Sequence, residues 1–215
     1  MIQELIDQKL LQAQEEKAKK ERSGLWAPGR FGRCYRFQYW SRKKEIETNP
    51  PDITALRRFK VGSVFHDYIQ KFYPQELTEI EVKQDDIIGY LDVEQHSFVI
   101  DIKTVKEWEY KHICKEDFNV EEDKEPNCMQ VCTYAWLRNK PNAILCFVNI
   151  ASLESKEFIL NVAEWIPKIQ EELAILRGFW EKEVVPPAIP RAYGGKECSY
   201  CSYRDKCNKF EGKEV

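Results

Sequence analysis

Three short segments in the middle of the chain, residues 78–83, 86–93 and 97–104, constrain the fold most strongly. Each is rich in β-branched residues, and polar turns separate one from the next. Segments of this length and spacing predict three strands that pair as an antiparallel meander. The fold must therefore be built around a sheet, and it must accommodate the acidic residues that the second and third strands bring into it.

Helical patterns and two further strand patterns surround this meander. Apolar residues recur at helical spacing in four segments, 2–21, 53–73, 126–138 and 162–180. An aromatic and basic segment, 31–44, is expected to begin as a loop and continue into a helix. Pro167 is costly inside a helix and favours a later start or a kink in the last helix. The apolar run 143–150 predicts a buried strand, paired with 156–160.

The length of 215 residues favours a single domain, 1–215, with an α/β fold. Within it we expect an N-terminal helical segment (1–52), a core (53–185) and a cysteine-rich C-terminal segment (186–215). No apolar run approaches the length of a membrane span, and the first residues lack the apolar stretch of a signal peptide. The expected location is therefore the cytoplasm, without a membrane partner.

Two carboxylates and an amine are predicted to share one face of the second and third strands. The strand period places Val99, Asp101 and Lys103 on one face. If the hairpin loop consists of Gln95 and His96, Asp92 lies on the same face, diagonally about 7 to 8 Å from Asp101. An alternative is a solvated hairpin face, but Asp101 follows an apolar run in which an unpaired charge is costly.

Such a pair of carboxylates predicts a hard divalent cation, Mg²⁺ or Mn²⁺, because like charges close together need a cation between them. The ion would acidify a water molecule and stabilise charge on a phosphate, and the amine of Lys103 could hold that water or neutralise the transition state. The sequence therefore predicts hydrolysis of phosphodiester bonds.

Four of the eight cysteines are arranged as metal ligands. Cys198, Cys201 and Cys207 cluster near the C-terminus, and Cys34 lies far upstream. Four thiolates suit a [4Fe-4S] cluster or a structural zinc, and the spacing does not choose between them. The remaining cysteines are expected to be small buried hydrophobic residues: Cys114, Cys128, Cys132 and Cys146.

The order of these motifs over roughly residues 30–210 resembles the RecB-type branch of the PD-(D/E)XK nucleases. The resemblance rests on Gly89 to Asp92, the Asp-Ile-Lys run at 101–103, His66 upstream, and Gln130 and Tyr134 downstream. It implies a restriction-endonuclease-like core, in which a central mixed sheet is flanked by helices. It further implies that a metal is held by His66, Asp92, Asp101 and the backbone carbonyl of Ile102, and that the catalytic set is Asp92, Asp101, Lys103, Gln130 and Tyr134.

The cysteine arrangement is similar to that of the CRISPR-associated RecB-like exonucleases. This resemblance favours a [4Fe-4S] cluster at Cys34, Cys198, Cys201 and Cys207, within a helical iron–sulfur cap. It implies a Mg²⁺- or Mn²⁺-dependent deoxyribonuclease that acts as an exonuclease on single-stranded DNA or overhanging ends. The alternative is a DNA-end-binding adaptor subunit of a larger complex, such as CRISPR spacer acquisition, with integrase subunits or a helicase as partners.

Any DNA-binding surface must be local, because the formal net charge is -3. Four arginines interleave with aromatic residues in the 31–44 region and just before it, namely Arg30, Arg33, Arg36 and Arg42. They suit stacking against single-stranded DNA, or equally a partly buried helix with snorkelling cations. On the first strand, a solvated face is favoured for Glu79, whereas for Glu81 a solvated face and a role beside the metal are about equally favoured.

Overall fold

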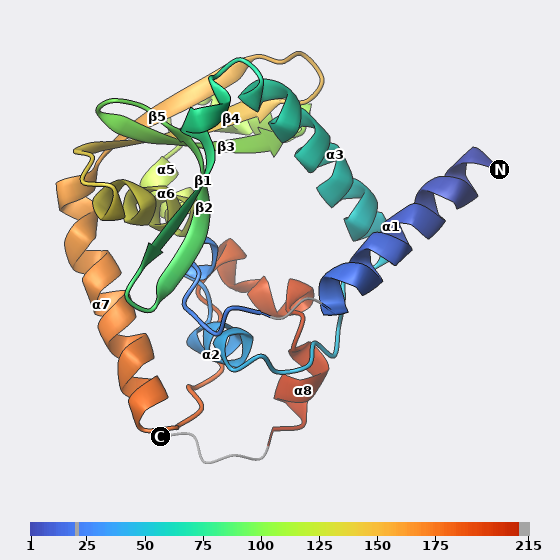
Figure 1. Cartoon of the computed structure of the whole chain (residues 1–215), viewed down its shortest axis with the longest axis vertical. Helices are drawn as coiled ribbons and strands as arrows, with labels where there is room; N and C mark the ends of the chain where they lie inside the picture. Colours follow the sequence, from blue (N-terminus) through green and yellow to red (C-terminus); the bar gives the residue numbers. More distant parts are fainter. Residues whose placement is uncertain (20–21, 211–215) are drawn as a thin grey trace.

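The computed structural model describes residues 1–19 and 22–210. Five strands form one mixed sheet, in the order β1-β2-β3-β4-β5 (Figure 1). The strands are β1 (Thr78–Gln84), β2 (Ile87–Glu94), β3 (Phe98–Val105), β4 (Asn142–Asn149) and β5 (Ser155–Asn161). The pairs β1·β2, β2·β3 and β4·β5 are antiparallel, and β3·β4 is parallel. The predicted meander, and the pairing of the last two strands, are therefore confirmed.

Helices cover both faces of this sheet. The α-helices are α1 (Ile2–Lys19), α2 (Tyr35–Arg42), α3 (Ile53–Gln70), α4 (Glu107–Ile113), α5 (Val120–Asp123), α6 (Glu125–Leu137), α7 (Val162–Glu181) and α8 (Arg204–Asn208). Short 3-10 turns are η1 (Pro28–Arg30), η2 (Gln75–Leu77), η3 (Tyr193–Gly195) and η4 (Glu197–Tyr200). The crossover from β3 to its parallel neighbour β4 contains α4, α5 and α6, because parallel strands need a long connection.

The buried strand β4 separates two hydrophobic cores. Leu145 and Phe147 point into the larger core, which includes residues of α6 and α7. Ile144 and Cys146 point into a smaller core on the other face, where Ile69 of α3 packs. Because both faces of β4 are covered, its sequence is continuously apolar and does not alternate.

The last long helix begins at Val162, where its apolar pattern begins, and so not at the later start that was one of the two alternatives favoured by Pro167. The side chain of Asn161 accepts a hydrogen bond from the backbone nitrogen of Ala163 (3.2 Å) and caps α7 at Val162. Pro167 lies inside the helix. The predicted later start is thus wrong, since this N-cap satisfies a free amide of the first turn.

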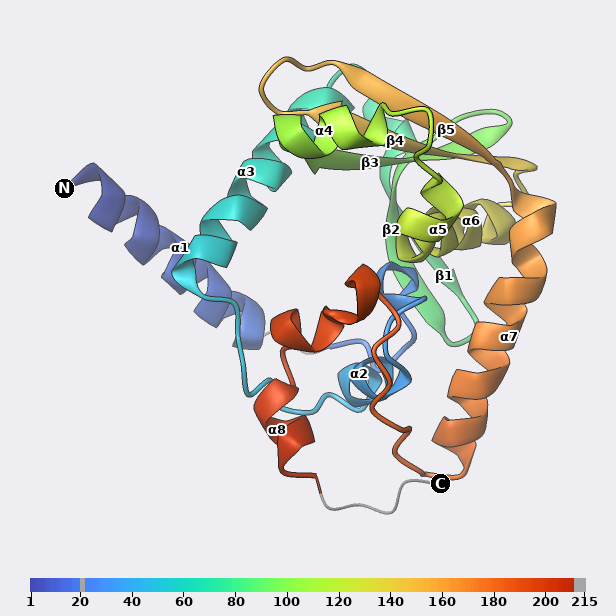
Figure 2. The same cartoon turned by 180° about the vertical axis from the view of Figure 1, so that it is seen from behind.

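Helix α2 and the C-terminal tail pack together. Phe37 and Trp40 of α2 form a core with Tyr203 from the C-terminal tail, in which the Trp40 and Tyr203 rings are 5.7 Å apart. Both views show α2 beside the tail (Figures 1 and 2). Residues 20–21 of the predicted first helix and 211–215 of the cysteine-rich segment lie outside the described residues.

The aromatic side chains of the 31–44 segment are largely buried around helix α2, so these rings do not form a stacking surface for DNA. Phe31 is fully buried, and Arg36 and Trp40 are only 3% and 2% exposed. Arg42 lies 4.4 Å from the ring centroids of both Trp26 and Trp180. The interpretation as a partly buried helix is therefore confirmed.

Among the described helices, none is long and apolar enough to cross a membrane.

Candidate metal centre

Asp101, in the middle of β3, is the most deeply buried acidic residue of the hairpin, at 1% exposure. Lys103 Nζ lies 2.8 Å from its Oδ2, yet neither carboxylate oxygen accepts a hydrogen bond from a described residue. Burial raises the pKa of Asp101 to about 6, against the opposing charge of Lys103. A carboxylate in this position gains from a cation that replaces its lost hydration.

Asp92 lies on β2, and the register of the hairpin differs from the one predicted. The pairs are Glu94 with Val99 and Val93 with Ile100, so the loop consists of His96 and Ser97 and not of Gln95 and His96. Continuing this register places Asp92 opposite Asp101 instead of diagonal to it. Asp92 Oδ2 accepts a hydrogen bond from the backbone nitrogen of Ile102 (2.6 Å). The side chain thereby joins the two strands where their backbone ladder ends.

His66 extends from α3 toward the same carboxylate. Its Nε2 lies 2.9 Å from Asp92 Oδ2, and its Nδ1 lies 3.6 Å from Glu79 Oε1. One donor atom from each of His66, Glu79 and Asp92 lies within 4.8 Å of the others. The hydrogen bond with Asp92 raises the pKa of His66, although burial lowers it.

Glu79 is a residue that sequence reasoning undervalued. It is exposed, but its backbone has a φ of 51°, which is uncommon outside glycine, and its side chain accepts a hydrogen bond from Gln70 Nε2 (2.8 Å). Glu81 instead accepts a hydrogen bond from the hydroxyl of Tyr90 (2.7 Å). The structure therefore reverses the predicted ranking of the two glutamates.

Lys103 connects this centre to α6. Its Nζ donates to Gln130 Oε1 (3.1 Å). Burial lowers the pKa of Lys103, but the charges of Asp101 and Asp92 raise it by more. The net shift of this pKa is upward, so the amine stays protonated. Tyr134, one turn further along α6, is 4% exposed, and burial raises its pKa. The structure thus brings Gln130 and Tyr134 together on the helix face that backs the acidic hairpin.

The four predicted cysteine ligands line one small pocket of about 40 Å³. Cys34 is buried, Cys201 and Cys207 are half-buried, and Cys198 is exposed. Burial raises the pKa of Cys34 and of Cys201, so both are thiols when no metal is bound. Among the described residues, the only group of three donor atoms within 4.8 Å of one another is the one around His66, so no three of the four sulfurs form such a group.

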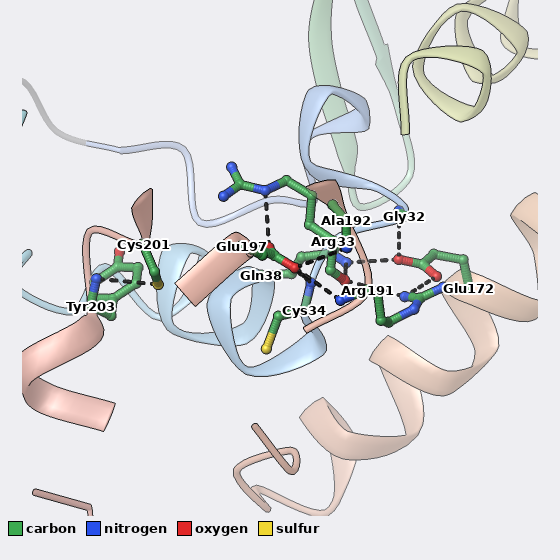
Figure 3. A network of polar contacts seen from close by, with 10 residues as sticks. All are labelled: Gly32, Arg33, Cys34, Gln38, Glu172, Arg191, Ala192, Glu197, Cys201 and Tyr203. Atoms are coloured by element: carbon green, nitrogen blue, oxygen red, sulfur yellow. Dashed lines mark hydrogen bonds and ion pairs between the residues drawn. The ribbon is translucent and has the colours of Figure 1, made fainter. Parts of the chain in front are cut away.

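Two buried glutamates tie the cysteine pocket to the rest of the protein (Figure 3). Glu197, 1% exposed, accepts hydrogen bonds from the backbone nitrogens of Cys34 (3.0 Å) and Arg191 (3.1 Å) and from Arg33 Nε (3.1 Å). Glu172 of α7 accepts from the backbone nitrogen of Gly32 (3.1 Å). The carboxylate of Glu197, the residue before Cys198, therefore fixes the position of Cys34. The sequence alone did not indicate this role of Glu197.

Comparison with known proteins identifies the fold. No protein-family model and no curated protein matches the sequence. Among solved structures, the crystal structure of SSO0001 has a TM-score of 0.56 at 20% identity, covering 100% of this chain and 98% of that one. An alkaline exonuclease (LHK-Exo) from Laribacter hongkongensis has a TM-score of 0.50 at 14% identity, covering 78% of this chain and 95% of that one. At these identities the likeness shows the fold alone: the chain shares with these structures an α/β arrangement in which a five-stranded mixed sheet is flanked by helices.

Proposed function

We propose that this chain is a divalent-metal-dependent nuclease that hydrolyses phosphodiester bonds in DNA. The observation that carries the proposal is the buried carboxylate of Asp101, which has Lys103 as its ion-pair partner, accepts no hydrogen bond from a described residue, and lies within electrostatic reach of Asp92 and His66. A buried carboxylate with so few partners is costly, so such a site persists where a ligand uses it. Hard oxygen donors with one imidazole suit Mg²⁺ or Mn²⁺.

The residues around the ion divide into two groups. His66, Asp92, Asp101 and the carbonyl of Ile102 would hold it, and when bound it supplies an acidified water and stabilises charge on the phosphate. Lys103, kept protonated between Asp101 and Gln130, would place a positive charge beside the developing phosphate charge. Gln130 limits the movement of the Lys103 amine, and Tyr134 supports the helix face from which Gln130 extends.

DNA as the substrate, and an exonucleolytic mode on single strands, are further parts of the proposal. They are supported by the fold shared with a protein described as an alkaline exonuclease. The test uses single-stranded, blunt and overhanging DNA labelled at one end, with Mn²⁺, Mg²⁺ or EDTA. We expect metal-dependent digestion, fastest on single strands, and loss of at least about 100-fold in rate for Lys103→Gln. Equal rates for this variant and the parent would overturn the proposal.

We also propose that Cys34, Cys198, Cys201 and Cys207 bind a [4Fe-4S] cluster. Support comes from the single pocket that all four cysteines line. Four thiolates suit a [4Fe-4S] cluster as well as a structural zinc. The choice of the cluster follows the resemblance of the cysteine spacing to that of the iron–sulfur nucleases.

Iron and sulfide analysis of anaerobically purified protein tests this assignment. We expect about four iron atoms per chain, a brown colour, and loss of both in Cys198→Ser. Cys114→Ser is the matched control, because Cys114 lies outside the pocket and is exposed; the prediction that Cys114 is buried is therefore wrong. A colourless protein containing zinc would contradict the cluster and leave the nuclease proposal standing.

A further inference from the structure

Two exposed tyrosines lie on the turns that precede α8. Tyr193 of η3 is 59% exposed and Tyr200 of η4 is 75% exposed. Their ring centroids are 6.4 Å apart, and the ring planes meet at 78°. The segment carrying them lies between α2 and the sheet in both views (Figures 1 and 2). This is an aromatic surface that the proposed chemistry does not use.

The backbone that carries Tyr193 has an uncommon conformation. Tyr193, Gly194 and Gly195 all have positive φ values, of 56°, 58° and 79°, and the first is unusual because it is not glycine. The preceding residue, Ala192, is 3% exposed, and its backbone nitrogen donates to the buried carboxylate of Glu197 (3.4 Å). The backbone next to the exposed ring is thus anchored to the protein interior through Glu197.

A guanidinium lies beside the same ring. Arg33 Cζ is 5.7 Å from the centroid of Tyr193, and Arg33 Nε is fixed by its hydrogen bond to Glu197 (3.1 Å; Figure 3). The Arg33 side chain is 17% exposed, so one part of it still reaches solvent. A ring and a guanidinium side by side are the groups that stack against nucleobases and contact phosphates.

This pair of groups adjoins the candidate metal centre. The backbone nitrogen of Arg33 donates a hydrogen bond to the carbonyl of Arg30 in η1 (3.3 Å). A Cβ at Gly29 of the same turn would be 3.6 Å from Nε2 of Gln130, the residue that holds Lys103. Arg33, and Tyr193 beside it, are thus connected to the metal centre through η1 and Gln130.

We propose that Tyr193, assisted by Tyr200 and Arg33, forms a stacking subsite for an unpaired nucleobase next to the phosphate at the metal centre. The inference rests on the proposed nuclease function and specifies its substrate class. A base within a duplex is stacked and paired and cannot lie against the ring. The subsite therefore selects single strands and overhanging ends by their free bases, without requiring a particular base.

The test measures binding of single-stranded DNA with 2-aminopurine near its end, in Ca²⁺ to prevent cleavage. In the parent, we expect 2-aminopurine fluorescence to be quenched on binding. Tyr193→Asn, chosen because asparagine tolerates positive φ, is expected to bind about tenfold more weakly and to quench less. Tyr193→Phe keeps the ring and is expected to behave as the parent. With an abasic residue at the stacked position, parent and Tyr193→Asn should bind equally.

The two levels of the proposal fail in different ways. If the parent neither binds nor cleaves any DNA, the proposed function is wrong, and the subsite with it. If the parent binds and cleaves single strands but Tyr193→Asn has unchanged affinity and quenching, the stacking subsite is wrong and the nuclease proposal stands. Circular dichroism and Mn²⁺ affinity of Tyr193→Asn, expected to equal those of the parent, exclude misfolding as the cause of weaker binding.

Discussion

Gly89 of β2 lies directly against the ring of Tyr134 on α6. A Cβ at position 89 would be 2.8 Å from Cε1 of that ring and would overlap its hydroxyl oxygen. Only a residue without a side chain allows β2 to approach α6 this closely. The contact sets the distance between the strand that leads to Asp92 and the helix that supplies Gln130.

Gly89→Ala is therefore expected to lower the free energy of unfolding by about 1 to 3 kcal/mol, because the ring must move. It should also slow cleavage, since Gln130 shifts with the helix. Urea denaturation and end-labelled DNA digestion measure the two effects. Gly178→Ala is the control: nothing lies within 4 Å of its Cβ position in α7, and a helical glycine replaced by alanine should gain about 0.5 to 1 kcal/mol. Similar effects of the two substitutions would refute the steric account.

Metal affinity is expected to rise with pH because of His66. Its hydrogen bond to Asp92 raises its pKa above the usual 6.5, so in the metal-free protein the protonated pair is stabilising below that pH, and the stabilisation is lost as pH rises through the higher folded-state pKa. A cation must displace this proton. Calorimetric Mn²⁺ titrations in two buffers of different ionisation enthalpy should show proton release, reduced in His66→Gln. Proton release of the same size in the variant would assign it to another group.

Glu79 is expected to strengthen metal binding through His66. Its Oε1 lies near Nδ1, the imidazole nitrogen that faces away from Asp92, and carboxylates in this position fix the orientation of a ligating histidine. Glu79→Gln should lower Mn²⁺ affinity by about 10- to 100-fold. Glu81→Gln, on the same strand but bonded to Tyr90, should leave it unchanged. The opposite ranking of the two variants would show that Glu81 is the functional carboxylate.

Asp86, in the turn between β1 and β2, joins two distant parts of the chain. It accepts hydrogen bonds from Arg177 of α7 and from Arg42 of α2 (3.0 Å). Burial alone would raise the pKa of Asp86, but the two arginines together lower it.

Asp86→Asn is expected to cost about 1 to 3 kcal/mol of stability at neutral pH, because Arg42 is left largely buried without its carboxylate. In the parent, the contribution of Asp86 is present above the ordinary aspartate pKa of 3.8 and is lost as pH falls through the lower folded-state value. Thermal unfolding is measured between about pH 2 and pH 7, a range that extends below the ordinary aspartate pKa. The difference in stability between variant and parent should shrink at the acid end of this range. A constant difference would mean that the ion pairs are not its source.

The strands and long helices could be predicted from the sequence because their signals are local. The β-branched segments around the acidic hairpin and the apolar run of β4 each indicate a strand by their own composition, without reference to distant residues. The predicted hairpin loop, Gln95-His96, lies one residue before the observed loop, His96-Ser97. The sequence does not distinguish the two, since both are plausible two-residue loops. Both loops hold two residues, so the face shared by Asp92 and Asp101 was still predicted.

The parts that were missed depend on contacts distant in sequence. A positive φ at Glu79 turns that side chain toward His66, and no strand pattern signals it. Arginines alternating with aromatic residues in α2 suit an exposed DNA surface as well as a buried helix, and the packing of Tyr203 decides between them. Glu197 becomes important only because the tail folds back onto Cys34, although its position beside Cys198 was a weak signal.

The most direct test of the central claim is Mn²⁺ binding by Asp101→Asn, followed by calorimetry and by electron paramagnetic resonance. Asparagine preserves the shape of the side chain but leaves the Lys103 amine without its counter-charge, so some stability is lost. Circular dichroism verifies that the variant is folded before Mn²⁺ is added. We predict that Mn²⁺ affinity falls by at least about 100-fold and that DNA cleavage is lost with it. Unchanged Mn²⁺ affinity in a folded Asp101→Asn protein would contradict the assignment of this carboxylate to the metal centre.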